Sequence, residues 1–322
     1  MKELNIIGGS GFIGTNLSKL FTELNLSFVN IDKNNSKRYP ENRLQGDVRD
    51  IESLRETLVA DSKIINLAAE HADNVTPLSL YHDVNVQGAK NICKVASEKN
   101  IDTIIFTSTV AVYGFAPLNT NETGDINPFN EYGKTKHEAE EVFTNWQQED
   151  SSKRVLVIIR PTVVFGENNR GNVFNLLQQI ASSVFLMIGN GRNKKSMAYV
   201  ENISSFIKYS LDFEPGVHVY NYIDKPDYNM NTLILKVKKV LGLKEGIGPR
   251  LPFSIGILIG KTFDLISKLT GRKFKVSEIR IRKFCANTLF DTSISETGFV
   301  PPISIDKGLE RTLKYEFIKD NK

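Results

Sequence analysis

The sequence of 322 residues has little cysteine, little histidine and no strong charge of either sign. Its two cysteines, Cys93 and Cys285, are too few for a disulfide framework or a zinc site built from thiolates. We expect the four histidines to be structural or surface groups, and we expect no metal site. Lys and Arg total 41 against 37 Asp and Glu, a net charge of +4 that gives no indication of a nucleic-acid partner.

The sequence also has no long hydrophobic run. Its longest apolar stretch covers residues 251–260 and is interrupted by Lys261 and Asp264. About 20 apolar residues are needed to cross a bilayer, so we expect no membrane span. The stretch could still cover a surface or line a core, and a short apolar helix is more often part of a core than a membrane anchor. The first residues, Met1-Lys2-Glu3, do not resemble a secretory leader, and together with the scarce cysteines they predict a cytoplasmic protein.

What the sequence does have is ordinary globular composition, with 40% apolar and 24% charged residues. In the first half, short apolar runs alternate with amphipathic stretches. The strand candidates are residues 4–7, 27–31, 63–67, 103–107 and 154–159. The helix candidates between them are residues 12–25, 50–60, 78–99 and 131–149. This alternation predicts an α/β fold, a Rossmann-type doubly wound parallel sheet covered by helices on both faces.

After residue 161 the alternation weakens. Helices are expected at 173–183, 201–212, 229–241 and 253–269, with a loop at 242–252. We therefore expect residues 1–165 to form the doubly wound domain, with part of 192–222 returning to it. Residues 166–322 are expected to form mainly a smaller, mostly helical substrate-binding lobe, because doubly wound sheets bind ligands at the carboxyl ends of their strands.

A glycine-rich turn directly follows the first strand candidate. Gly8, Gly11 and Gly14 have the spacing GxxGxxG, with Phe12 and Ile13 at the start of the next helix. Glycine permits a tight strand-to-helix turn and a close approach of the backbone to a pyrophosphate, which the free N–H groups of the helix then bind. The turn predicts a dinucleotide site.

Two acidic residues extend the predicted dinucleotide site. Asp32 ends the second strand, 18 residues after Gly14, where a carboxylate accepts hydrogen bonds from the adenosine ribose and repels a 2′-phosphate. NAD is therefore favoured, although nearby Lys33 keeps NADP as an alternative. Asp47 could contact the adenine amino group or could cap the helix at 50–60, and the sequence does not decide between these roles.

Tyr132 and Lys136 lie four residues apart at the start of a predicted helix, and this spacing places both side chains on one face. An ammonium beside a phenol lowers the phenol pKa from about 10, which makes the tyrosine a usable acid and base. Ser108 and Thr109 follow the strand at 103–107, at the edge where the dinucleotide is expected. A hydroxyl there could bind the substrate oxygen, or it could only cap the backbone.

This set of motifs resembles the extended short-chain dehydrogenase/reductases, in the nucleotide-sugar epimerase/dehydratase family, over nearly the whole chain. The matching segments are Gly8–Gly14, Asn66–Ala69, Asn85–Gly88, Thr109–Gly114, Tyr132–Lys136 and Arg160-Pro161. The resemblance implies that Thr109, Tyr132 and Lys136 are catalytic. It also implies cofactor contacts from Val48, Leu67, Ala68, Ala69 and Pro161. For the substrate it implies contacts from Asn172, Val173 and Lys195, with Ser108 nearby, although Lys195 stands where the family usually has Arg.

Two departures from the family pattern narrow the reaction. No carboxylate follows Thr109, which argues against dehydration, and no cysteine lies near Tyr132, which argues against the epimerase-reductases. The resemblance then implies an NAD(P)-dependent 4-epimerase of a nucleoside-diphosphate hexose or N-acetylhexosamine, UDP-linked, with transient hydride transfer at carbon 4. The alternatives are a 4-reductase of a nucleoside-diphosphate 4-keto-6-deoxy sugar in polysaccharide synthesis and, more remotely, a dinucleotide-binding protein without catalysis. We also expect a homodimer.

Overall fold

The computed structural model describes residues 3–36, 38–72, 75–182, 185–272, 274 and 276–318. The chain forms two compact units, each assembled from separate segments. Unit 1 contains residues 1–162, 198–223 and 291–303. Unit 2 contains residues 163–197, 224–290 and 304–322. The two units are described separately below.

Unit 1 contains a seven-stranded parallel sheet in the order β10-β6-β5-β4-β1-β2-β3. The strands are β1 (Leu4–Ile7), β2 (Phe28–Asp32), β3 (Arg43–Gln45), β4 (Lys63–Asn66), β5 (Thr103–Thr107), β6 (Val155–Pro161) and β10 (Gly216–Tyr222). Every residue of β1, β5 and β6 is buried, as expected for strands covered on both faces. The doubly wound parallel sheet is confirmed, and all five strand candidates are present with ends shifted by at most two residues.

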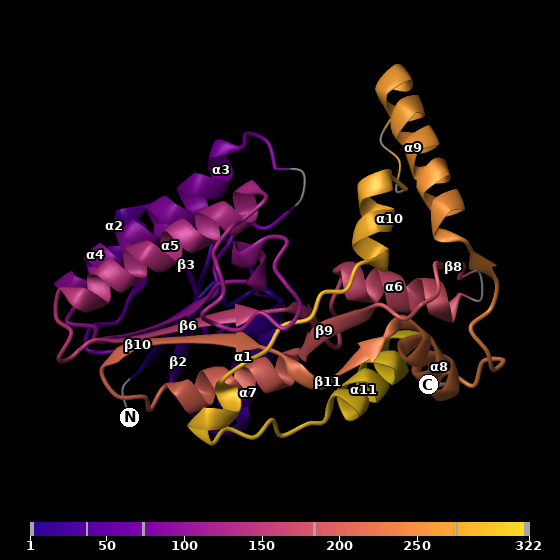
Figure 1. Ribbon diagram of the computed structural model, residues 1–322. Helices are drawn as coiled ribbons and strands as arrows, with labels where there is room; N and C mark the ends of the chain where they lie inside the picture. Colours follow the sequence, from indigo (N-terminus) through magenta and orange to yellow (C-terminus); the bar gives the residue numbers. More distant parts are fainter. Residues whose placement is uncertain are drawn as a thin grey trace. The chain divides into compact units, whose positions relative to one another are not determined.

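Helices cover both faces of this sheet, with α4 and α5 on one side and α1 and α7 on the other (Figure 1). The helical segments of unit 1 are α1 (Phe12–Glu23), α2 (Ile51–Thr57), α3 (Ser79–His82), the π-helix η1 (Asp83–Gln87), α4 (Gly88–Glu98), the 3₁₀-helix η2 (Val110–Tyr113), α5 (Glu131–Gln148), α7 (Val200–Ser210) and the 3₁₀-helix η3 (Ile294–Thr297). The side chains of α4 and α5 enclose an apolar core with the sheet, which includes Phe106, Phe143 and Trp146.

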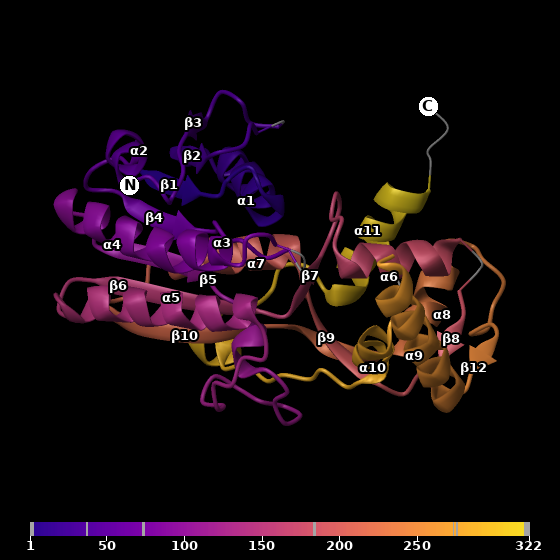
Figure 2. The same cartoon turned by 90° about the horizontal axis from the view of Figure 1, so that it is seen from above.

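Unit 2 combines small sheets with helices. Its sheets have the orders β11-β9-β7 and β12-β8. The elements are β7 (Val163–Phe165), α6 (Asn172–Ala181), β8 (Met187–Ile188), β9 (Lys194–Tyr199), β11 (Asp224–Asn229), α8 (Met230–Val240), β12 (Arg250–Leu251), α9 (Phe253–Thr270), α10 (Glu278–Cys285) and α11 (Ile305–Phe317). Figure 2 shows α10 beside α9, as the first view also does.

Helix α9 contains most of the longest apolar stretch of the sequence. Of the two roles left open by the sequence, covering a surface or lining a core, most of its side chains do not line a core, because only Gly256 and Gly260 of α9 are buried. Within the described parts of the chain, none of the helices combines the length and the apolar composition needed to cross a bilayer.

Candidate active site

The glycine turn joins β1 to α1 where three segments of the backbone meet. Gly8 has φ of +80°, and a Cβ on it would lie 2.7 Å from the Ala68 nitrogen. A Cβ on Gly14 would lie 2.6 Å from the Gly9 Cα, so this position also requires glycine. The two glycines therefore permit the start of α1 to lie close to the ends of β1 and β4.

The first turn of α1 is suited to bind a pyrophosphate. Gly11 is the N-cap and supplies no side chain to the N–H groups of the helix, and the first turn contains no acidic residue. The N–H groups of Phe12, Ile13 and Gly14 are among those that a helix leaves without intrahelical partners, and they attract anions. The turn thus fits the diphosphate of NAD.

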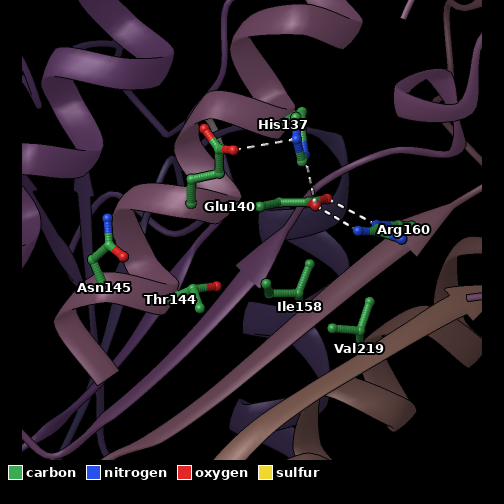
Figure 3. A pocket seen from close by; sticks show the side chains of 8 residues that line it. His137, Glu140, Thr144, Asn145, Ile158, Arg160 and Val219 are labelled. Carbon is green, nitrogen blue, oxygen red and sulfur yellow. Dashed lines mark hydrogen bonds and ion pairs between the residues drawn. The ribbon is translucent and has the colours of Figure 1, made fainter. Parts of the chain in front are cut away.

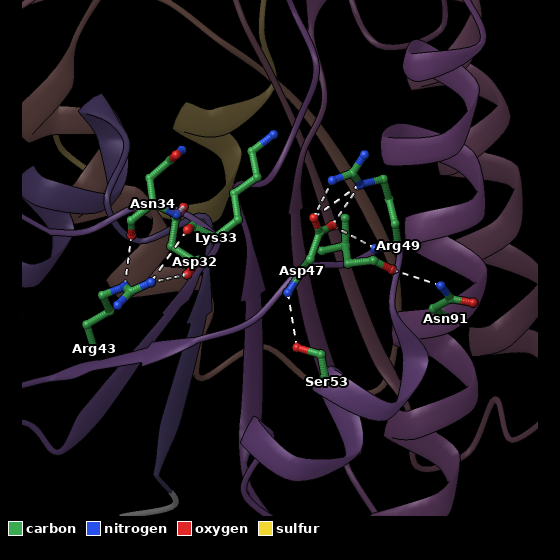
Figure 4. Close-up of polar contacts among 9 residues, drawn as sticks. Asp32, Lys33, Asn34, Arg43, Asp47, Arg49, Ser53 and Asn91 are labelled. Carbon is green, nitrogen blue, oxygen red and sulfur yellow. Dashed lines mark hydrogen bonds and ion pairs between the residues drawn. The ribbon is translucent and has the colours of Figure 1, made fainter.

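Asp32 ends β2, and its carboxylate is fixed by backbone groups (Figure 4). It accepts hydrogen bonds from the Ser10 nitrogen at 3.0 Å and from the Asn34 nitrogen at 2.8 Å. Arg43 donates to the carbonyl oxygens of Asn34 and Asp32, at 2.9 and 3.2 Å. The carboxylate is thus held in position beside the glycine turn, where an adenosine ribose would lie. The sequence did not indicate Arg43, because its role depends on the pairing of β3 with β2.

Asp47 does not cap the helix that follows it. The cap of α2 is Asp50, which accepts hydrogen bonds from the nitrogens of Glu52 and Ser53. Arg49 donates to both carboxylate oxygens of Asp47 and holds its pKa below the usual value (Figure 4). The structure therefore keeps Asp47 ionised and leaves the expected adenine contact as a proposal.

The other expected cofactor residues follow the ends of neighbouring strands. Leu67 donates its N–H to the Ile7 oxygen at 2.8 Å, and Ala68 donates to Asn66 Oδ1 at 3.1 Å, with Ala69 directly after. Val48 is buried, and its carbonyl accepts a hydrogen bond from Asn91 at 2.8 Å. Pro161 is the last residue of β6. These residues occupy the carboxyl edge of the sheet, where doubly wound folds bind nucleotides.

Thr109 and Tyr132 come together at the start of α5. Thr109 caps η2 by accepting a hydrogen bond from the Ala111 nitrogen, and its side chain lies near enough to Tyr132 to lower the pKa of that phenol. A Cβ on Gly133 would lie 2.6 Å from the Ala111 oxygen, so glycine at this position permits α5 to approach η2 closely. Asn130 caps α5 by accepting from the Gly133 nitrogen at 2.9 Å. The local backbone thus holds the phenol beside the threonine hydroxyl.

Burial changes the acidity of the two expected catalytic groups of α5. It raises the pKa of Tyr132 to about 12, against a smaller lowering by the nearby Thr109. It lowers the pKa of Lys136 to about 7, and the Lys136 nitrogen lies 4.0 Å from the centre of the Phe106 ring. Desolvation favours the neutral form of each group, and the expected lowering of the tyrosine pKa by Lys136 stays a prediction.

A buried ion pair that the sequence did not indicate lies one turn beyond Lys136. Glu140 accepts two hydrogen bonds from Arg160, at 2.9 and 2.6 Å, and both side chains are almost inaccessible to solvent. Arg160 also donates to the Tyr113 hydroxyl at 2.7 Å. Glu140 opposes the lowering of the Lys136 pKa, so this network acts on the lysine electrostatically. Ser108 is buried, and its hydroxyl has no hydrogen-bond partner among the described residues, so its expected contact with substrate stays a prediction.

The outer side of this network borders a surface cavity of about 490 Å³ in unit 1 (Figure 3). His137 lines the cavity, with its ring nitrogens 3.6 Å from Glu140 and 3.5 Å from Glu141. The nearby carboxylates raise the pKa of His137. These contacts agree with the structural role expected for this histidine.

Asn85 is a second positioning residue that the sequence did not assign. It is buried in the π-helix η1 and exchanges hydrogen bonds with the backbone of Glu70, at 2.9 and 3.1 Å. It also donates to the Thr135 hydroxyl at 3.0 Å. Asn85 thus links the loop after β4 to α5. Its signal in the sequence was the Asn85–Gly88 motif, which shows the residue types but not their partners.

Three of the expected substrate residues, Asn172, Val173 and Lys195, belong to unit 2. Asn172 and Val173 begin α6, and Val173 is buried. Lys195 in β9 donates to the Lys283 oxygen at 2.8 Å, and burial lowers its pKa to about 8. A cation whose pKa is lowered by burial gains stability from a bound anion. Contacts of these residues with substrate remain predictions.

Comparisons with known proteins agree with this geometry. Residues 4–222 match the model of the NAD dependent epimerase/dehydratase family. The chain is 49% identical to the N-acetyl-alpha-D-glucosaminyl-diphospho-ditrans,octacis-undecaprenol 4-epimerase of Escherichia coli O157:H7, over 98% of this chain and 96% of that protein. It is 26% identical to the UDP-glucose 4-epimerase of Vibrio cholerae, over 97% of this chain and 94% of the other.

A solved structure shows the same fold. The UDP-glucuronic acid 4-epimerase from Bacillus cereus, in complex with NAD, has a TM-score of 0.74 at 18% identity and covers 97% of this chain and 98% of its own. The family match spans more than half of the chain, and the identity to the Escherichia coli protein extends over nearly all of it. This protein therefore belongs to the NAD dependent epimerase/dehydratase family.

Proposed function

We propose that this protein inverts carbon 4 of an N-acetylhexosamine that is linked through a diphosphate to a polyprenol. The observation that carries this proposal is the 49% identity, over 98% of the chain, to an enzyme named for that reaction. The Thr109–Tyr132–Lys136 set is intact, and the glycine turn and Asp32 fit NAD. The proposal keeps the expected 4-epimerisation and replaces the expected UDP by a lipid carrier.

The residues divide the proton transfer between them. Tyr132, as phenolate, removes the proton of the 4-hydroxyl, while the neighbouring Thr109 orients the same oxygen. Bound NAD supplies the one function that no side chain can, the reversible acceptance of a hydride from carbon 4. Once the 4-keto sugar has rotated in the site so that its other face is presented, Tyr132 returns the proton to the oxygen on carbon 4, which forms the hydroxyl of the inverted sugar. No net oxidation occurs, so the enzyme needs no second substrate.

Lys136 would have two roles in this mechanism, one electrostatic and one in positioning the coenzyme. Its ammonium stabilises the Tyr132 phenolate and can bind the hydroxyls of the nicotinamide ribose. Burial favours the neutral lysine, whereas Glu140 favours the charged one. The Glu140 carboxylate, held by Arg160, therefore raises the pKa of Lys136, and through Lys136 it acts on the pKa of Tyr132.

The test is a comparison of carriers without added coenzyme. N-acetylglucosaminyl-diphospho-polyprenol in detergent and UDP-N-acetylglucosamine are each incubated with the purified protein, and the products are separated by sugar configuration. We expect the N-acetylgalactosamine epimer only from the lipid-linked sugar. Epimerisation of UDP-N-acetylglucosamine alone would contradict the proposed carrier and would restore the expected nucleotide-sugar substrate.

The Tyr132→Phe variant tests the catalytic assignment. We expect it to lose turnover by at least about 100-fold, the usual contribution of a positioned acid or base, while it keeps bound NAD. Tyr315→Phe, which removes an exposed hydroxyl bonded to Asn168, is the matched control and should be unchanged. Unchanged turnover in Tyr132→Phe would support dinucleotide binding without this chemistry. Stoichiometric oxidation of added NADH with a 4-keto sugar would support the reductase.

A further inference from the structure

Helix α9 of unit 2 has two sides of opposite character. One side contains glycines that lie close to neighbouring elements: a Cβ on Gly256 would be 2.7 Å from an Ile188 side-chain carbon. A Cβ on Gly260 would be 2.7 Å from the Glu278 nitrogen at the start of α10. The glycine side is therefore packed against β8 and α10, and this contact fixes which side of α9 faces outward.

The other side of α9 is apolar and exposed. Its members are large aliphatic residues at helical spacing, with 38–76% of each exposed: Ile255, Leu258, Ile259, Leu265, Ile266 and Leu269. Residues three, four and seven positions apart share one face of a helix, so these side chains form one continuous stripe along α9. An exposed stripe of this kind marks an interaction surface.

The surrounding sequence is strongly basic. Residues 250–283 contain nine Lys and Arg against two Asp and Glu, whereas the whole chain has a net charge of only +4. The remainder of the chain is therefore net negative. Lys261 and Lys268, seven residues apart, lie along one flank of the apolar stripe. The partner of this surface should accordingly be both apolar and anionic.

We propose that the exposed face of α9 lies in the surface of an anionic phospholipid bilayer. An amphipathic helix with apolar side chains on one face and lysines beside them binds in the plane of the membrane interface. Clustered Lys and Arg attract anionic headgroups. A second copy of this chain fits less well, because it would bring two strongly basic segments together.

This inference rests on α9 itself and does not require the proposed substrate. If the substrate is a lipid-linked sugar, its polyprenol remains in the bilayer, and binding of α9 to the membrane would bring the enzyme to that sugar. Vesicle binding is measured without substrate. Failure of one proposal can therefore be distinguished from failure of the other.

The experiment is flotation of the full-length protein with vesicles of phosphatidylcholine, with and without phosphatidylglycerol. We expect binding to the anionic vesicles, weakened by salt. Leu258→Gln/Leu265→Gln/Leu269→Gln should reduce the vesicle-bound fraction at least about tenfold, since it removes three apolar contacts with the bilayer. The control, Leu24→Gln/Leu78→Gln/Leu235→Gln, changes three exposed leucines outside α9 and should bind as the unmodified protein does.

A second variant separates charge from folding. Lys261→Gln/Lys268→Gln keeps the apolar stripe and should weaken binding only to vesicles that contain phosphatidylglycerol. Thermal melting checks that each variant is folded, and light scattering measures its mass. No vesicle binding by the unmodified protein, equal loss in the control, or conversion of a dimer to a monomer by the α9 leucine changes would each overturn the proposal.

Discussion

Tyr132 and Lys136 show how burial acts on single residues of the site. Each group is shifted toward its neutral form, the tyrosine to a pKa of about 12 and the lysine to about 7. Proton removal by Tyr132 at neutral pH thus depends on nearby positive charge, which the bound oxidised coenzyme and protonated Lys136 both supply. Tyr132 would therefore be available as phenolate at neutral pH mainly when the coenzyme is bound.

Lys136→Met should stabilise the folded protein, by on the order of 4–5 kcal/mol at neutral pH and below. The folded pKa of Lys136 is about 7 and its model value is 10.5. Below pH 7 the lysine is charged in both states, so folding bears the whole cost of burying the charge. Between pH 7 and 10.5 that cost declines, because only the unfolded state still binds the proton.

The measurement is urea unfolding of both proteins at pH 6.5 and pH 9.5. The stability difference should be smaller at the higher pH. A difference that does not change with pH would mean that Lys136 is charged in the fold throughout this range.

Residue types and spacing predicted on which elements most of the candidate site residues lie. The glycine turn, Asp32, Thr109, Tyr132 and Lys136 could be placed because their local motifs determine where they lie on strands and helix starts. Glu140 could not, because in a helix with many charged residues nothing in the pattern distinguishes a buried glutamate from an exposed one. Its role depends on Arg160, which comes from a different strand.

Single helices and strands also divide into those that local sequence predicts and those that depend on contacts in the folded chain. β1, β2, β4, β5 and β6 were predicted close to their observed ends, because each has a short apolar run between helical patterns. β3 was not among the candidates, because it has three residues and only its leucine is apolar. β10 was also missed, since its histidine, asparagine and tyrosines interrupt the apolar pattern, and it is recognisable only by its pairing with β6. For α9 the sequence predicted the helix and its apolarity but not how little of it would be covered.

The buried ion pair between α5 and β6 makes a second stability prediction. Arg160→Met should destabilise the protein by about 3–5 kcal/mol, because it leaves the Glu140 carboxylate buried without its main partner. Glu140→Gln/Arg160→Met should recover much of this loss, since no uncompensated charge remains. Denaturant unfolding of the three proteins measures both values. An equal loss in the single and double variants would show that packing of Arg160, not charge, carries the effect.

At the scale of the whole molecule, neither unit is continuous in the sequence. Unit 1 requires residues 198–223 and 291–303 in addition to its first 162 residues. A fragment of residues 1–165, the boundary expected from the sequence, lacks β10 and α7. β6 would then be an uncovered edge, although all seven of its residues are buried in the full chain.

We therefore expect the fragment 1–165 to lack a cooperative thermal transition and to bind a hydrophobic dye, with the full-length chain as the control. A cooperative transition for the fragment would contradict this expectation. The expected homodimer stays a prediction, which the light-scattering mass of the full-length protein tests directly.

The discontinuous course of the chain also affects how the protein is made. During synthesis the first six strands of the sheet emerge by residue 161, yet β10 emerges only at residues 216–222 and the last segment of unit 1 at residues 291–303. Domains usually fold as units during synthesis, and the ribosome adds roughly 5–20 residues per second. Synthesis of residues 162–222 at this rate takes on the order of 3–12 s. During that interval the β6 edge of the nascent sheet is uncovered, and we expect chaperones to bind there.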